Sequence, residues 1–234
     1  MKKHLILINI LLFSLAYTQI TYKISIKEKI SNSQFIVKID INNISSENYI
    51  IPIDTTGFKA SYPDEMCSLL NSEYPYKYLS PTIILQNNKN KQYMEPYTRT
   101  YDVPEESISR IEKHIDSSLQ KRKILINDWV IKENIKDIKT VEKNFYLMEN
   151  LIALKSKTSF SCEIFIDLFT IKRSELLLNY DSYVLGPNNE YLFSSIICID
   201  KKVYSYLTKK QKRKFKKYKL FSGKIESNKI EIKQ

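Results

Sequence analysis

Glycine is scarce in this chain of 234 residues, and its scarcity excludes several classes of enzyme. The three glycines, Gly57, Gly186 and Gly223, lie far apart in the sequence. The phosphate-binding G-x-G-x-x-G and Walker A loops both need glycines close together, so neither loop is present. The G-x-S-x-G nucleophile elbow is absent as well. The sequence therefore argues against nucleotide-dependent enzymes and α/β-hydrolases.

Histidine is equally rare, with His4 and His114 as its two occurrences. His4 lies in a segment that we expect to be removed, which leaves His114 as the one candidate imidazole base. A single histidine excludes paired-histidine metal motifs, and we predict neither a metal site nor a cofactor. His114 neighbours Ile111 and Ile115 on a helical stripe, which favours a place beside a packed face over a catalytic role.

The first 18 residues have the pattern of a signal peptide. Lys2 and Lys3 precede an apolar run from Leu5 to Leu15, which is too short to span a bilayer as a helix. Ala16 and Thr18 fit the small-x-small cleavage rule. We therefore expect an exported protein, periplasmic or extracellular, whose mature chain begins at Gln19 and has no transmembrane segment.

The net charge of +11 comes largely from one segment, 209–219. Its cations are Lys209, Lys210, Lys212, Arg213, Lys214, Lys216, Lys217 and Lys219. An exported protein does not ordinarily meet nucleic acid, so we expect no nucleic-acid partner. The segment is interpreted as a solvated structural face that can make weak contacts with anionic surfaces. Just before it, Thr208 is expected to cap a short helix.

Three cysteines, Cys67, Cys162 and Cys198, would meet an oxidising compartment in an exported protein. Cys162 and Cys198 lie in two apolar strand-like segments that a sandwich could bring together, so they are candidates for a disulfide, with two small buried residues as the alternative. Cys67 would then be free.

Hydrophobic periodicity predicts a mainly β fold. Apolar residues alternate with polar ones in "ITYKISIKEKI" and "QFIVKIDINNIS", and again in "SFSCEIFIDLFTI", "YLFSSIICID" and "KIEIK" near the C-terminus. Pro52 should end a third strand or place it at an edge. Between these halves, Ile108, Ile111, Ile115 and Leu119 indicate an amphipathic helix. We expect one domain, 19–234, that is an antiparallel sandwich with a mixed helical and loop insertion at about 60–148.

A family resemblance points the same way. The segments "FIVKIDINNISSENYIIPID", "LIALKSKTSFSCEIFIDL" and "FSGKIESNKIEIK" resemble the opening, later and closing strands of small exported Ig-like β-sandwiches. Such domains occur in secreted proteins of Bacteroidetes and, more distantly, in BsuPI-type protease-inhibitor domains. The resemblance implies an Ig-like fold and a compartment outside the cytoplasm, and it carries over no catalytic residue.

Tyrosines are concentrated between residues 62 and 101, and they supply the predicted binding site. The candidates are Tyr74, Tyr76, Tyr78, Tyr93, Tyr97 and Tyr101, which could form an aromatic platform for a protein or a glycan. The alternative is that these rings cover the core. We expect a non-enzymatic binding or structural module of the cell envelope.

Two alternatives remain open. Carboxylates alone can hydrolyse glycans, and the candidates in this region are Asp64, Glu65, Glu95, Asp102, Glu105 and Glu106. The other alternative is inhibition of a protease.

Overall fold

The computed structural model describes residues 19–62, 76–174, 176 and 178–233. The predicted signal peptide and four of the residues singled out above, Asp64, Glu65, Cys67 and Tyr74, lie outside the described residues. Strands account for 38% and helices for 26%, so the expected mainly β class is corrected to a mixed α/β fold with several small, mostly antiparallel sheets and one long helix.

The first sheet contains the strands that alternation predicted most clearly. Strands β1 (Ile20–Lys29), β2 (Gln34–Asn43) and β7 (Ser159–Asp167) are antiparallel in the order β1-β2-β7. Along β2 the residues Phe35, Val37, Ile39 and Ile41 are all buried, whereas their neighbours are only partly covered. The period of two in the sequence is therefore confirmed as one buried face of a sheet.

The second sheet is centred on β10 (Glu190–Ile199). Strand β4 (Thr82–Asn87) pairs with one edge of β10, while β12 (Gly223–Glu226) and β13 (Ile230–Lys233) pair with the other. β4 lies inside the region that the sequence predicted as an insertion, 60–148. Part of that region therefore belongs to a central sheet.

Two further sheets are small. One has the order β11-β3-β6, with β11 (Lys219–Leu220), β3 (Tyr49–Pro52) and β6 (Leu151–Leu154), and the β11–β3 pairing is parallel. The other has the order β5-β9-β8, with β5 (Tyr97–Thr100), β9 (Asn179–Ser182) and β8 (Ile171–Lys172). Pro52 is the last residue of β3, as its missing N–H predicted.

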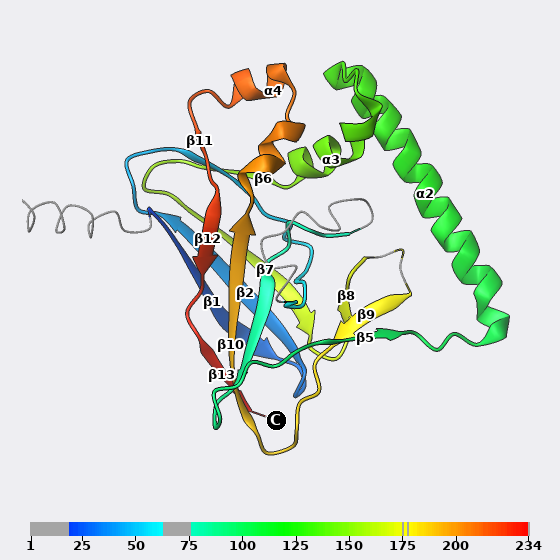
Figure 1. Cartoon of the computed structure of the whole chain (residues 1–234), viewed down its shortest axis with the longest axis vertical. Helices are drawn as coiled ribbons and strands as arrows, with labels where there is room; N and C mark the ends of the chain where they lie inside the picture. Colours follow the sequence, from blue (N-terminus) through cyan, green and yellow to red (C-terminus); the bar gives the residue numbers. More distant parts are fainter. Residues whose placement is uncertain (1–18, 63–75, 175, 177, 234) are drawn as a thin grey trace, which may run out of the picture.

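Asn228 joins the first sheet to the second. Ile24 in β1 donates its backbone N–H to Oδ1 of Asn228 at 2.9 Å, and Nδ2 of Asn228 donates to the carbonyl oxygen of Ile24 at 3.1 Å. The amide of Asn228, in the turn between β12 and β13, thus replaces a neighbouring strand at this position. Residues of both sheets belong to one apolar core, and β1 passes beside β12 and β13 (Figure 1).

The long helix α2 (Glu105–Glu133) lies at the side of the molecule, and its C-terminal end is next to α3 (Ile138–Glu149) (Figure 1). Asn134 ends α2 in the left-handed conformation with φ 51°. The helix was predicted, but its apolar stripe does not form a packed face. None of the α2 residues is buried, and Ile108 and Leu119 are 43% and 44% exposed.

The basic segment begins after the 3-10 helix η2 (Lys201–Tyr206) and forms α4 (Lys209–Lys214). Thr208 caps α4, as predicted, by accepting a hydrogen bond from the backbone N–H of Gln211 at 3.2 Å. Within the part of the chain that the structure describes, no helix has the length and apolar character needed to span a membrane.

Candidate functional site

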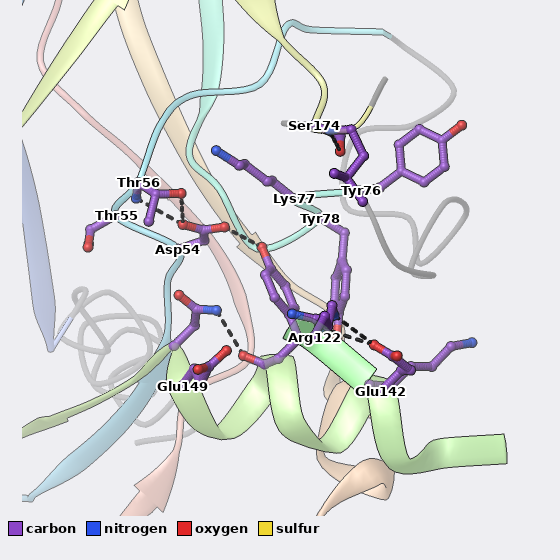
Figure 2. Close-up of a pocket in the computed structure, with 14 residues that line it drawn as sticks. Asp54, Thr55, Thr56, Tyr76, Lys77, Tyr78, Arg122, Glu142, Glu149 and Ser174 are labelled. Atoms are coloured by element: carbon purple, nitrogen blue, oxygen red, sulfur yellow. Dashed lines mark hydrogen bonds and ion pairs between the residues drawn. The ribbon is translucent and has the colours of Figure 1, made fainter. Parts of the chain in front are cut away.

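A pocket of about 450 Å³ opens beside α3 (Figure 2). This volume falls within the range of roughly 300–1,000 Å³ that small-molecule sites occupy. We call it the Asp54 pocket. Its walls come from the loop after β3, the segment before β4, helices α2 and α3, and the chain after β8. The lining residues are Asp54, Thr55, Thr56, Tyr76, Lys77, Tyr78, Arg122, Glu142, Lys143, Tyr146, Glu149, Asn150, Ser174 and Leu176.

Asp54 forms a fixed part of the pocket wall. It lies two residues after the buried strand β3 and is itself only 2% exposed. Its Oδ1 accepts hydrogen bonds from the backbone N–H and the hydroxyl of Thr56, at 2.8 and 2.6 Å. Its Oδ2 accepts a 2.6 Å hydrogen bond from the hydroxyl of Tyr146 in α3. Burial and the nearby Asp54 charge raise the pKa of Tyr146, so this phenol stays protonated and acts as the donor.

Arg122 and Glu142 form another part of the wall and connect α2 to α3. Nη2 of Arg122 lies 3.0 Å from Oε2 of Glu142, and Nε of Arg122 donates to the same oxygen at 3.1 Å. The guanidinium also lies over the ring of Phe145, 5.2 Å from its centroid. These contacts hold one polar wall of the pocket in place.

Tyr78 supplies a buried hydroxyl that has no hydrogen-bond partner among the described residues. The side chain is 8% exposed, and its ring lies 5.0 Å from the ring of Tyr146. Burial raises the pKa of Tyr78, so the hydroxyl is a neutral donor and acceptor. Leaving such a group unpaired costs about 1–3 kcal/mol. The oxygen is sealed from solvent, so Tyr78 offers a ligand in the Asp54 pocket its ring and not its hydroxyl.

Glu149 lies at the exposed side of the pocket. Partial burial raises the pKa of this carboxyl, the nearby Arg122 opposes the rise, and the charge of Asp54 adds to it. Three carboxyl groups therefore line one pocket in different surroundings: Asp54 is buried, Glu142 is paired with Arg122, and Glu149 is exposed.

The structure does not gather the predicted tyrosines into one platform. Tyr76 and Tyr78 line the Asp54 pocket. Tyr93 is 63% exposed beside a different, smaller pocket near β4 and β10. Tyr97 is 59% exposed on β5, and Tyr101 packs against Tyr180 with ring centroids 4.5 Å apart. Two of the six candidates thus belong to the pocket. Tyr93, Tyr97 and Tyr101 lie elsewhere, and Tyr74 is outside the described residues.

The acidic candidates of the hydrolase alternative are spread over the surface. Glu95, Asp102, Glu105 and Glu106 are all exposed, and none of them lines the Asp54 pocket. His114 is exposed on α2. The described residues contain no group of three or more His, Cys, Asp or Glu side chains placed to hold a metal ion.

The candidate disulfide between Cys162 and Cys198 is not formed. Cys198 is disulfide-bonded, whereas Cys162 in β7 carries a free thiol. Both strands are present, but β7 and β10 belong to different sheets, and alternation along a strand does not reveal which strands are neighbours. Burial raises the pKa of the Cys162 thiol to about 11.

The cations of segment 209–219 are exposed, as the solvated-face interpretation predicts. Two of them contact carboxylates: Lys210 lies 3.6 Å from Glu133, and Lys219 lies 3.2 Å from Glu47.

Sequence reasoning missed the polar residues that build the Asp54 pocket. Asp54 and Thr56 stand two positions apart after an apolar strand, which is the signature of an Asx turn. No local pattern connects this turn to Tyr146 or Arg122, because the three lie in distant parts of the sequence. Comparisons with protein-family models, with curated proteins and with solved structures found no match.

Proposed function

We propose that this protein is a non-catalytic binding module whose ligand is a saccharide unit held in the Asp54 pocket. The observation that carries the proposal is a pocket of small-molecule size whose wall combines tyrosine rings with a carboxylate and hydroxyl groups held in place by hydrogen bonds. Small-molecule sites typically pair apolar and aromatic surface with a few precisely placed polar groups.

The chemistry of the wall favours a neutral polyol. Three cationic residues, Lys77, Arg122 and Lys143, are balanced by Asp54, Glu142 and Glu149. Tyrosine rings provide apolar surface, while hydroxyl, amide and carboxylate groups provide hydrogen-bond partners, which together suit the apolar face and the hydroxyl groups of a sugar.

The proposed role is binding without turnover, because Asp54 is poorly suited to act as a nucleophile or base. Both of its oxygens already accept hydrogen bonds, from Thr56 and Tyr146, and the residue is almost fully buried. In this arrangement Asp54 positions Tyr146 and the loop after β3.

Matched tyrosine variants test the proposal against a panel of neutral oligosaccharides. Tyr76→Ala removes a half-exposed ring from the Asp54 pocket, and Tyr93→Ala removes a ring of the same type from another part of the surface. Isothermal titration should show saccharide binding that Tyr76→Ala weakens and Tyr93→Ala leaves unchanged. Equal effects of the two substitutions would reject the pocket as the site.

A glycan hydrolase is the second candidate function. It is favoured by the raised pKa of Glu149, which suits a general acid, in a pocket that holds further carboxylates. Incubation with the same oligosaccharides separates the two functions. Released shorter sugars that disappear in Glu149→Gln support hydrolysis, and intact sugars support binding alone.

Export and an Ig-like sandwich are part of the same proposal. The disulfide at Cys198 supports an oxidising compartment outside the cytoplasm. The common core of the β1–β2–β7 and β10-centred sheets, together with the Asn228 bridge, supports a two-layer sandwich. Protease inhibition stays an untested prediction.

A further inference from the structure

Cations from three separate segments meet at one end of the molecule. They are Lys132, Lys136 and Lys139 at the α2–α3 junction, Lys201 and Lys202 in η2, and the cations of 209–217. Helix α4 lies there beside η2 and the junction of α2 with α3 (Figure 1). Lys210 contacts both the carbonyl oxygen of Lys132, at 3.5 Å, and the carboxylate of Glu133. We call this region, formed by segment 209–217, η2 and the α2–α3 junction, the basic end. Its positive charge therefore extends beyond the segment that the sequence singled out.

The carboxylates at the basic end are already engaged within the protein. Glu133 is only 12% exposed and contacts Lys210. Asp137 caps α3 by accepting from the backbone N–H of Lys139 at 3.1 Å, and Asp200 caps η2 by accepting from Lys202 at 2.8 Å. Each of these acids has a structural partner, whereas the cations around them face the solvent.

Buried hydrogen bonds hold α4 in place although its like charges oppose a helix. Five of its six residues are cationic, so they repel one another, and lysines at the N-terminus oppose the helix dipole. Gln211 is the one buried residue of α4. It exchanges hydrogen bonds with the buried Asn144 of α3, at 2.7 and 3.2 Å. This amide pair fixes the helix so that its cations point outward as a set.

We propose that the basic end docks the protein on an anionic lipid bilayer surface. Positive charge spread over three segments complements a negatively charged surface. Lysine predominates, and Arg213 is the one arginine in the segment. Lysine is a point charge that suits mobile lipid headgroups, whereas bidentate phosphate recognition in nucleic acid favours arginine. Ile131, next to Lys132, is 79% exposed and provides an apolar side chain for shallow insertion. This docking is independent of the Asp54 pocket.

Vesicle sedimentation with charge-matched variants tests the proposal. The test variant replaces Lys212, Arg213, Lys214 and Lys216 with Ser, and the control replaces Lys23, Lys89, Lys113 and Lys155, four exposed lysines outside the basic end, with Ser. Both variants lose four charges and keep residues 1–18 unchanged. A difference in vesicle binding between them therefore reports the position of the lost charges and not the net charge. Vesicles of phosphatidylcholine alone are compared with vesicles that also contain phosphatidylglycerol, and circular dichroism verifies folding.

The native protein should sediment with the phosphatidylglycerol vesicles, and added salt should release it. The partition coefficient of the test variant on phosphatidylglycerol vesicles should fall at least about tenfold, and that of the control should fall much less. Equal losses in the two variants, or no binding to phosphatidylglycerol, would overturn the proposal. Tight binding to duplex DNA or heparin without binding to the vesicles would overturn it too. If the test variant does not fold, Lys201→Ser combined with Lys202→Ser is measured against the same prediction.

Discussion

The hydroxyl of Tyr146 donates a 2.6 Å hydrogen bond to Oδ2 of Asp54, across a separation of 92 positions in the sequence. This bond connects helix α3 to the loop after β3. It also places a tyrosine ring and a carboxylate in the wall of the same pocket, so one contact contributes to both the fold and the candidate site.

Tyr146→Phe should destabilise the protein. The substitution keeps the ring but leaves the buried Oδ2 of Asp54 without its partner, which costs about 1–3 kcal/mol. Urea denaturation measures the loss in the free energy of unfolding. Tyr97→Phe is the control, because Tyr97 is 59% exposed and should tolerate the change. An unchanged midpoint for Tyr146→Phe would show that the bond does not stabilise the fold.

Glu149→Gln should change how stability depends on pH. Because the folded protein raises the pKa of Glu149, the folded state binds this proton more tightly than the unfolded state. The contribution of Glu149 to the free energy of unfolding is therefore fully present below its ordinary pKa, and it is lost as pH rises through the raised pKa of the folded state. Native protein and variant should be closest in stability in acid, and the variant should gain relative stability as pH rises through this window. A difference that does not vary with pH contradicts the assignment.

Asn144→Leu should loosen the contact between α2 and α3. Oδ1 of Asn144 accepts from Nε1 of Trp129 at 2.8 Å, and Nδ2 donates to the carbonyl oxygen of Tyr206 at 2.6 Å. Leucine is similar in size but leaves these groups unpaired, so we expect a loss of about 2–4 kcal/mol. Trp129 is the single tryptophan, so its fluorescence reports this site directly. The emission should shift to longer wavelength, and an unshifted spectrum would contradict the prediction.

Alkylation should distinguish the cysteines. Cys162 has a free thiol, but its pKa of about 11 leaves little thiolate at neutral pH. Iodoacetamide should therefore modify Cys162 slowly at neutral pH and faster as pH rises, while Cys198 should react only after reduction. Mass spectrometry of the peptides measures both. Rapid modification of Cys198 without a reductant would show that its disulfide is absent.

The sequence predicted the elements that local periodicity determines. Alternation in β2 marked its buried face, the stripe from Ile108 to Leu119 marked a helix, and Thr208 marked the start of α4. Each of these signals lies within a few neighbouring residues, where backbone geometry alone sets the pattern.

The features that were missed depend on contacts between distant segments. The pairing of β4 with β10 brings residues 82–87 against 191–196, and no local signal specifies that partner. The Asp54 pocket needs side chains from five parts of the chain. The tyrosines were candidates because many of them lie in one stretch of sequence. Which of them line a pocket depends on the neighbouring segments, and the topology of the fold determines those neighbours.

The central claim is that the Asp54 pocket binds a saccharide against tyrosine rings that include the partly exposed ring of Tyr76. The most direct test is the dissociation constant of the best-bound oligosaccharide for Tyr76→Ala and for the native protein. Because the ring of Tyr76 is only partly buried, its removal should change the free energy of unfolding little. We predict that affinity falls about tenfold in this variant. Unchanged affinity, or the absence of saccharide binding by the native protein, would contradict the account.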